Sequence, residues 1–287
     1  MKNDREMLDM EGLLRFYAEA GIDMPLSETP VDRFAAPPPT STRVPDTHSA
    51  AMPGSRPERT QQPPRAATPS ASNRPVKAAS DVPDNAQIEL ARVAAAQARS
   101  LEELREALAA FDGCSLKSTA KNLCFADGDP ASDIMFVGEA PGRDEDMEGL
   151  PFMGKSGQLL NGMIEAIGLK RENIYIANII PWRPPGNRPP TPLETELCRP
   201  FIERQIELAS PKILVALGGP AGKLLTGATE SIIRMRGNWK IHTTASRINI
   251  PVMPTLNPDS LLRTPAQKRF AWRDFLDVKM KLAELRD

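Results

Sequence analysis

Four short apolar segments dominate the pattern of hydrophobic and polar positions from residue 85 onward. They cover residues 133–137, 173–178, 212–217 and 250–253, and residues typical of turns bound each of them. Their apolar residues are nearly continuous instead of alternating with polar ones, as in strands buried on both faces of a parallel sheet. We therefore predict a four-stranded, mostly parallel central sheet.

Helical patterns lie between and around these strands. Apolar residues recur at helical spacing in five segments, namely 87–110, 158–167, 193–208, 222–225 and the stretch that follows Thr264-Pro265. Helices that connect parallel strands cover both faces of the sheet, so the fold class that we predict is three-layer α/β/α. Ligands of such sheets bind at the carboxyl ends of the strands. Candidate chemistry should therefore lie in the loops that follow the four strands.

The first third of the chain has a different composition. Twelve of the 29 prolines fall between Pro30 and Pro83, and no Phe, Trp or Tyr occurs from residue 35 to residue 110. Such a segment cannot bury enough apolar surface to offset its chain entropy. We predict three regions: a short helical segment at 1–29, a disordered Pro-rich linker at 30–86, and a globular domain at 87–287. The N-terminal helix either docks on its own domain or binds a protein partner.

Composition and charge exclude several classes of protein. Lys and Arg number 36 against 37 Asp and Glu, so no global basic field indicates a nucleic-acid partner. No run approaches the ~18 apolar residues of a membrane helix, and we expect neither a signal peptide nor a membrane partner. Three cysteines cannot form a fully paired disulfide framework, which favours a reducing, cytoplasmic location. Two histidines leave few options for multi-histidine metal sites.

The segment 149–156 matches the phosphate-binding pattern G-x-x-x-x-G-K-[ST] letter for letter. A phosphate-binding loop must leave a strand directly and open a helix, so that its amides face the phosphates. Here the preceding strand ends near Val137, and Pro151 removes one of the amides. A nucleotide-binding protein is therefore the least favoured of three functional hypotheses.

The loop after the first strand, residues 138–146, has two glycines and a proline within five residues, which predicts a rigid turn whose amides can face a ligand. Its acidic residues are also consistent with a merely solvated loop. Phe152 follows in a segment framed by Gly and Pro without helical or strand periodicity. An aromatic side chain in such a place favours stacking on a flat ring over packing in a core.

Two further loops carry polar side chains. Asn178 ends the second strand, and its amide offers an acceptor and two donors in one plane, as reading a base edge requires; a buried Asn bound only to backbone is the alternative. The segment 254–263 combines Asn257 with an exposed-looking pair, Leu261 and Leu262. This loop could insert an apolar wedge into a duplex, or its leucines could simply pack on the sheet.

Five motifs together resemble the family 4 uracil-DNA glycosylases, in unbroken order from about residue 113 to residue 276: GEAPGRDED at 138–146, PFMGKSGQLL at 151–160, YIANIIPWRPPGNRPPTP at 175–192, CRPF at 198–201 and NPDSLLRTP at 257–265. The resemblance implies uracil excision from DNA. It places the water-positioning carboxylate on Glu145, the stacking aromatic on Phe152 and the base-reading amide on Asn178, with the backbone of Glu139 and Ala140 against the base. DNA contacts are expected from one further set of residues: Lys155, Ser156, Leu261, Leu262, Arg263, Lys268 and Arg269.

The chain departs from that family at its iron–sulfur ligands. The resemblance implies four cysteines, but only Cys114 and Cys198 match, and Lys117 and Trp182 stand at the other two places. Cys124 has the wrong spacing to replace either of them. Two thiolates cannot hold a cluster that needs four, so we expect no iron–sulfur cluster, no other metal and no diffusible cofactor, with Trp182 packed where the cluster would lie.

A second departure concerns the leaving group. Asn257 stands where the resemblance implies a His that donates to uracil O2. A neutral amide can still donate one hydrogen bond, so we expect slower catalysis rather than none. The leading hypothesis is a monomeric, monofunctional uracil-DNA glycosylase in which Glu145 and Asn257 are catalytic. The alternative is a protein that binds uracil-containing or abasic DNA with little turnover.

Overall fold

The computed structural model describes residues 84–285. The chain divides into two units, Met1–Ser80 and Asp81–Asp287, and all described residues belong to the second. The predicted N-terminal helix and nearly all of the predicted linker lie outside the described residues. The first described helix, α2, begins at Asp84, three residues before the predicted start of the globular domain at residue 87.

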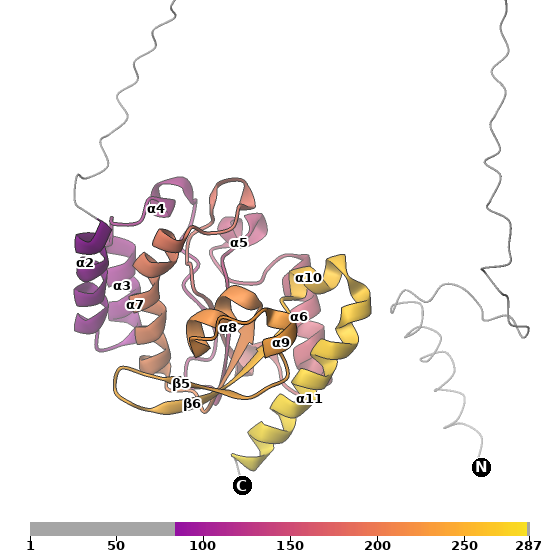
Figure 1. Ribbon diagram of the computed structural model, residues 1–287. Helices are drawn as coiled ribbons and strands as arrows, with labels where there is room; N and C mark the ends of the chain where they lie inside the picture. Colours follow the sequence, from indigo (N-terminus) through magenta and orange to yellow (C-terminus); the bar gives the residue numbers. More distant parts are fainter. Residues whose placement is uncertain (1–83, 286–287) are drawn as a thin grey trace, which may run out of the picture. The chain divides into compact units, whose positions relative to one another are not determined.

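One sheet forms the centre of the domain (Figure 1). Its strand order is β1-β3-β2-β4-β6-β5, with bounds β1 Asp127–Gly128, β2 Ile134–Gly138, β3 Tyr175–Asn178, β4 Ile213–Leu217, β5 Lys240–Thr243 and β6 Asn249–Thr255. The α/β class is confirmed, and the four inner strands are the predicted ones and are mutually parallel.

The sheet has six strands instead of the predicted four, because a short antiparallel strand is added at each edge. β1 has only two residues, and neither is apolar. β5 alternates between exposed and more buried positions, and His242 is its one buried residue. Neither edge strand contains the continuous apolar run that identifies a buried strand in the sequence.

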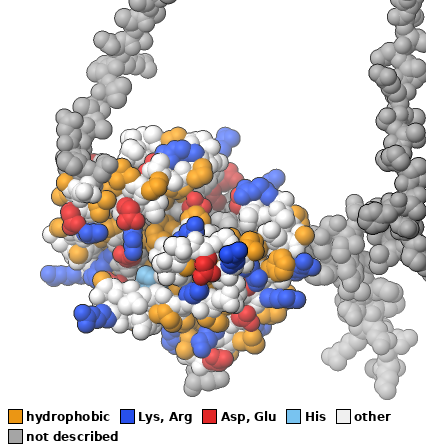
Figure 2. Space-filling view, viewed as in Figure 1, with side chains coloured by type: hydrophobic (Ala, Val, Ile, Leu, Met, Phe, Trp, Pro, Cys, Tyr) orange, Lys and Arg blue, Asp and Glu red, His pale blue; other side chains and the backbone are white. Residues whose placement is uncertain are grey.

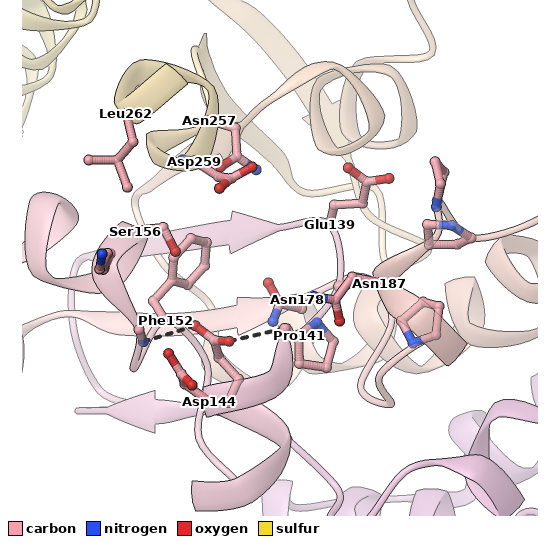
Figure 3. A pocket seen from close by; sticks show the side chains of 18 of the residues that line it. Glu139, Pro141, Asp144, Phe152, Ser156, Asn178, Asn187, Asn257, Asp259 and Leu262 are labelled. Carbon is pink, nitrogen blue, oxygen red and sulfur yellow. Dashed lines mark hydrogen bonds between the residues drawn. The ribbon is translucent and has the colours of Figure 1, made fainter. Parts of the chain in front are cut away.

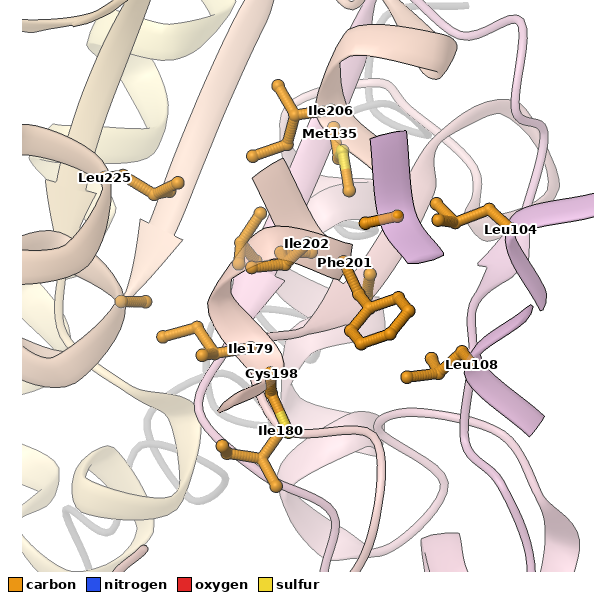
Figure 4. Close-up of a cluster of buried hydrophobic side chains, with 14 of the residues drawn as sticks. Leu104, Leu108, Met135, Ile179, Ile180, Cys198, Phe201, Ile202, Ile206 and Leu225 are labelled. Atoms are coloured by element: carbon orange, nitrogen blue, oxygen red, sulfur yellow. The ribbon is translucent and has the colours of Figure 1, made fainter. Parts of the chain in front are cut away.

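Alternate residues of the inner strands point to opposite faces, and each face carries its own core. α2 (Asp84–Gln97), α3 (Leu101–Ala110), α7 (Pro192–Ala209) and α8 (Gly219–Thr226) contribute to the first core (Figure 4). α6 (Lys155–Ala166) and α11 (Lys268–Glu284) cover the other face. The remaining short elements are α4 Leu116–Thr119, α5 Arg143–Glu148, η1 Arg171–Asn173, η2 Pro185–Asn187, α9 Ile232–Met235, α10 Pro258–Arg263 and η3 Pro265–Gln267.

Two differences from the predicted helices have a local cause. The segment 87–110 contains two helices, because the Ser100 side chain accepts a hydrogen bond from the Glu103 amide (3.1 Å) and caps a new helix there. Near the C-terminus, Pro265 opens a single 3-10 turn, and α11 itself begins three residues later at Lys268. None of the helices between Asp84 and Leu285 is long and apolar enough to cross a membrane.

Candidate active site

A cavity of about 600 Å³ lies at the carboxyl edge of the parallel strands (Figure 3). The loops after β2, β3 and β6 and the N-terminal end of α6 supply its walls. Ten of the predicted site residues line it: Glu139, Ala140, Glu145, Phe152, Lys155, Ser156, Asn178, Asn257, Leu262 and Arg263. The fold thus brings together side chains that are more than a hundred residues apart in the sequence.

Three predicted DNA-binding residues do not line the cavity. Leu261 is fully buried in a small core with Leu256 and Ala271, so the prediction that it is exposed to DNA is wrong. The two leucines differ because α10 turns one inward and the other outward, and Leu262 is 39% exposed. Lys268 and Arg269 lie at the start of α11, outside the cavity, where the Arg269 guanidinium stacks over a neighbouring Phe ring.

The floor of the cavity is formed where β2 and β3 end side by side. Gly138 pairs with Asn178 across the two strands. A Cβ atom at Gly138 would lie 2.3 Å from Asn178 Oδ1 and 2.6 Å from Phe152 Cζ, so only glycine fits between them. Asn178 Oδ1 is buried and accepts no hydrogen bond within the described part of the chain. A buried acceptor without a donor is costly, and a ligand N–H could satisfy it.

The loop that carries Phe152 has a specific backbone conformation. Phe152 has φ +54°, in the left-handed region that bulky residues rarely occupy. The start of α6 packs directly beneath this loop, since a Cβ at Gly157 would lie 1.8 Å from the Phe152 carbonyl oxygen. The ring itself is 8% exposed and faces the cavity (Figure 3).

The Glu145 carboxylate holds the two loops of the site together. It lies in the first turn of α5 and is 7% exposed. Its Oε2 accepts from the Gly142 amide (3.0 Å), and its Oε1 accepts from the amides of Met153 (3.0 Å) and Gly154 (3.2 Å). A carboxylate has about four acceptor sites, so this geometry leaves about one for a further donor such as water.

The hydrogen bonds of Glu145 also argue against a phosphate-binding loop at residues 149–156. α5 separates β2 from Gly154, so the loop does not leave a strand directly. The Met153 and Gly154 amides, which a nucleotide-binding loop would aim at phosphate, donate instead to Glu145. The local geometry therefore disfavours a nucleotide site here.

The cavity contains a second carboxylate, that of Glu139, whose side chain was not predicted to take part in the site. Glu139 directly follows β2 and lines the cavity, and its carboxylate has no hydrogen-bond partner among residues 84–285. Burial raises the pKa of Glu139 above its ordinary value. The sequence assigned only the backbone of this residue. Its place immediately after a buried strand was the available signal.

Asn257 serves as the N-cap of α10. Its Oδ1 accepts a hydrogen bond from the Asp259 amide (2.9 Å). This bond fixes the orientation of the side-chain amide, because the oxygen is held by the helix and the Nδ2 group remains for another partner. At the cavity wall, Asn257 therefore presents N–H donors.

The Pro-rich loop after β3 forms another wall of the cavity, and its residues were not among the predicted site residues. Its lining residues are Pro184, Asn187, Arg188, Pro189 and Pro190. Arg188 is held by Glu194 of α7, whose two carboxylate oxygens accept from its Nη1 (2.9 Å) and Nη2 (2.6 Å). This ion pair lowers the pKa of Glu194 and fixes the wall against the core helix. The spacing of prolines around an arginine could have indicated a rigid wall.

The cysteines do not fit a four-thiolate cluster. Cys114 and Cys198 are buried and joined by a hydrogen bond, which lowers the pKa of Cys114 and raises that of Cys198. Trp182 is buried in the same core. Cys124 Sγ instead donates to the Glu145 carbonyl (3.1 Å), and burial raises its pKa to about 12. Among the described residues, no three His, Cys, Asp or Glu side chains are arranged to hold a metal ion.

Comparisons with known proteins show which sequences this chain resembles. The family model of the uracil DNA glycosylase superfamily matches residues 125–276. A type-4 uracil-DNA glycosylase of Sulfurisphaera tokodaii is 37% identical over 188 residues, 63% of this chain and 84% of the relative. One of Archaeoglobus fulgidus is 35% identical (62% and 92%), and one of Thermotoga maritima is 38% identical (57% and 83%).

Proposed function

Because the chain belongs to the uracil DNA glycosylase superfamily, we propose that it hydrolyses the N-glycosidic bond of deoxyuridine in DNA, which releases uracil and leaves an abasic site. One observation carries this proposal most directly. Asn178 Oδ1 is a buried, unpartnered acceptor beside the Phe152 ring, as a planar base with an N–H donor would require. The uracil N3–H is such a donor.

The base reaches the cavity by leaving the duplex stack. Phe152 stacks on the extruded ring, and Asn178 pairs with its N3–H and O4. Cytosine presents the opposite pattern at these two atoms, since its N3 is an acceptor and its 4-amino group is a donor. The Asn178 amide therefore selects uracil, and the backbone at Glu139 and Ala140 supports the remaining edge of the base.

Hydrolysis breaks the bond between C1′ and uracil N1. The electron pair of that bond stays on uracil, which leaves as an anion, while a water molecule adds to C1′ and loses a proton. That proton reaches the uracil anion through solvent, so the products are an abasic sugar and neutral uracil. Glu145 orients this water through its remaining acceptor site and stabilises the positive charge that develops on the sugar. Asn257 donates from Nδ2 to uracil O2, where negative charge accumulates.

The DNA-binding face surrounds the cavity mouth. Leu262 fills the place of the extruded base, while Lys155, Ser156 and Arg263 contact the backbone nearby. Lys268 and Arg269 extend the contact along α11. Figure 2 shows basic and acidic side chains interspersed on the visible face, and the chain has 36 Lys and Arg against 37 Asp and Glu. Binding therefore depends on these local contacts.

We further propose that the protein acts as a monomer, in the cytoplasm and without an iron–sulfur cluster. The donor set supports the last point, because only two of the three cysteines, Cys114 and Cys198, lie in the buried core that contains Trp182. No step of the mechanism is assigned to a cofactor.

A cleavage assay tests the proposed function. Labelled DNA with one uracil is incubated with the protein and treated with alkali, and Glu145→Ala is compared with Asp144→Ala, an exposed carboxylate of the same cavity. We expect alkali-labile product from the wild type and from Asp144→Ala, and a loss of about 10²–10⁴-fold in Glu145→Ala. A uracil-dependent gel shift without product would instead favour the DNA-binding alternative.

A further inference from the structure

Arg171 lies outside the cavity, yet it binds the loop that carries Phe152. It begins η1, just before β3. A guanidinium has five N–H donors in a fixed fork, and here each has an acceptor. Nε donates to Asp127 (2.7 Å), Nη1 to the Phe152 carbonyl (3.1 Å) and Asn161 (2.9 Å), and Nη2 to the Pro151 carbonyl (2.6 Å) and Met153 Sδ (3.8 Å).

These bonds hold the strained part of the loop. A non-glycine residue at positive φ costs about 1–3 kcal/mol and persists only where its surroundings impose it. Arg171 binds the two carbonyls on either side of the Phe152 N–Cα bond, whose φ is +54°. Glu145 binds the next two amides, those of Met153 and Gly154. A cation and an anion thus hold successive peptide groups of one loop.

Arg171 is itself anchored to rigid elements. Asp127 belongs to the edge strand β1, and Asn161 lies on α6. The ion pair with Asp127 is only partly exposed, 21% for the Arg171 side chain and 26% for Asp127. The loop is therefore tied to both the sheet and a helix through one side chain.

We propose that Arg171 is a positioning residue for base excision: it holds the Phe152 backbone in the left-handed conformation that aims the ring into the cavity. This inference rests on the proposed function. Lysine cannot replace it, because an ammonium group has three donors and no planar fork with which to reach both carbonyls and both anchors. Arg171 does not line the cavity, so its effect passes through the Phe152 ring.

The test compares Arg171→Lys with Arg204→Lys. Arg204 is a matched control, since its side chain is 26% exposed and it also binds a carbonyl, that of Ala98 (2.8 and 3.1 Å), and a carboxylate, that of Glu207. It lies on α7, away from the cavity. We expect both variants to lose thermal stability, but only Arg171→Lys to lose about 100-fold in the single-turnover rate of uracil release.

A double-mutant cycle separates positioning from general destabilisation. If Arg171 acts through the ring, adding Arg171→Lys to Phe152→Ala should change the rate less than about threefold. Additive losses, or a wild-type rate in Arg171→Lys, would overturn the proposal. If Arg171→Lys fails to fold, Asp127→Asn takes its place in the test. A rate of uracil release by Asp127→Asn equal to that of Arg204→Lys would then overturn the proposal. Absence of uracil release by the wild type would overturn the proposed function itself, and the positioning role with it.

Discussion

A single side-chain amide, that of Asn257, has two tasks that substitution can separate. Its Oδ1 caps α10 through the Asp259 amide (2.9 Å), and its Nδ2 is left to face the cavity. The first task concerns folding, and the second, in the mechanism that we propose, concerns the leaving group. Alanine removes both, whereas aspartate keeps the acceptor and removes the donor.

The magnitudes follow from these contacts. Loss of an N-cap acceptor costs about 1 kcal/mol of stability. Loss of a donor to a developing oxyanion costs about 3–4 kcal/mol of transition-state stabilisation, or 10²–10³ in rate. For Asn257→Ala we therefore expect a modest loss of thermal stability and a loss of about 10²–10³-fold in uracil release.

Substitution of Asn257 by aspartate should instead preserve stability and lower the rate of uracil release. Asp is as good an N-cap as Asn, and a negative charge is favourable near a helix N-terminus. Asn257→Asp should therefore be as stable as the wild type. Its carboxylate would nevertheless lie against uracil O2 as negative charge develops there, so its rate should fall at least as far as that of Asn257→Ala.

Two measurements on the same three proteins decide the matter: thermal unfolding without DNA, and single-turnover release of uracil from labelled DNA. The expected order of stability is wild type and Asn257→Asp above Asn257→Ala, while the rate places Asn257→Asp lowest or equal lowest. A near-wild-type rate for Asn257→Asp would refute the donor role. A stability loss in Asn257→Asp as large as that in Asn257→Ala would refute the cap.

Two other predictions concern burial. Burial raises the pKa of Glu139, so the stability that its protonated form contributes is complete below the ordinary value of about 4.5 and is lost as pH rises through the folded value. The advantage of Glu139→Gln over the wild type in urea unfolding should grow between about pH 4 and about pH 7; a constant difference would contradict this. Leu261→Ala should cost about 2–5 kcal/mol of stability, because the residue is fully buried. Leu262→Ala should leave unfolding unchanged and weaken binding to uracil-containing duplex; equal stability losses in the two would contradict the difference in burial.

The inner sheet could be predicted from the sequence because its signal is local. Each inner strand is an apolar run, and burial on both faces requires such a run. The edge strands gave no comparable signal, since β1 is defined by its pairing with Tyr175 and Ile176 rather than by its own residues. The boundary between α2 and α3 at Ser100 could have been predicted, because Ser followed three residues later by Glu is a helix-capping pattern.

For the site, sequence reasoning found the residues that follow the strands and missed what their partners do. Asn178 ends β3, as the sequence predicted, and Phe152 lines the same cavity from the loop between α5 and α6. No local pattern could show that Leu261 turns inward, since the α10 face that packs on the core is set by helices distant in sequence. The partners of Arg171 lie up to 44 residues away, and they too become evident only in three dimensions.

The proposed catalytic groups share one structural property: each is held by a bond that also builds the fold. Glu145 binds the amide before α5 and the loop before α6, and Asn257 caps α10. Groups oriented in this way before substrate arrives need no reorganisation as charge develops, which is the condition under which fixed dipoles lower a barrier most. Substitutions at these positions should therefore impair folding and catalysis together, unless the new side chain preserves the structural bond. Asn257→Asp is the substitution in this site that meets that condition, which is why it separates the two effects.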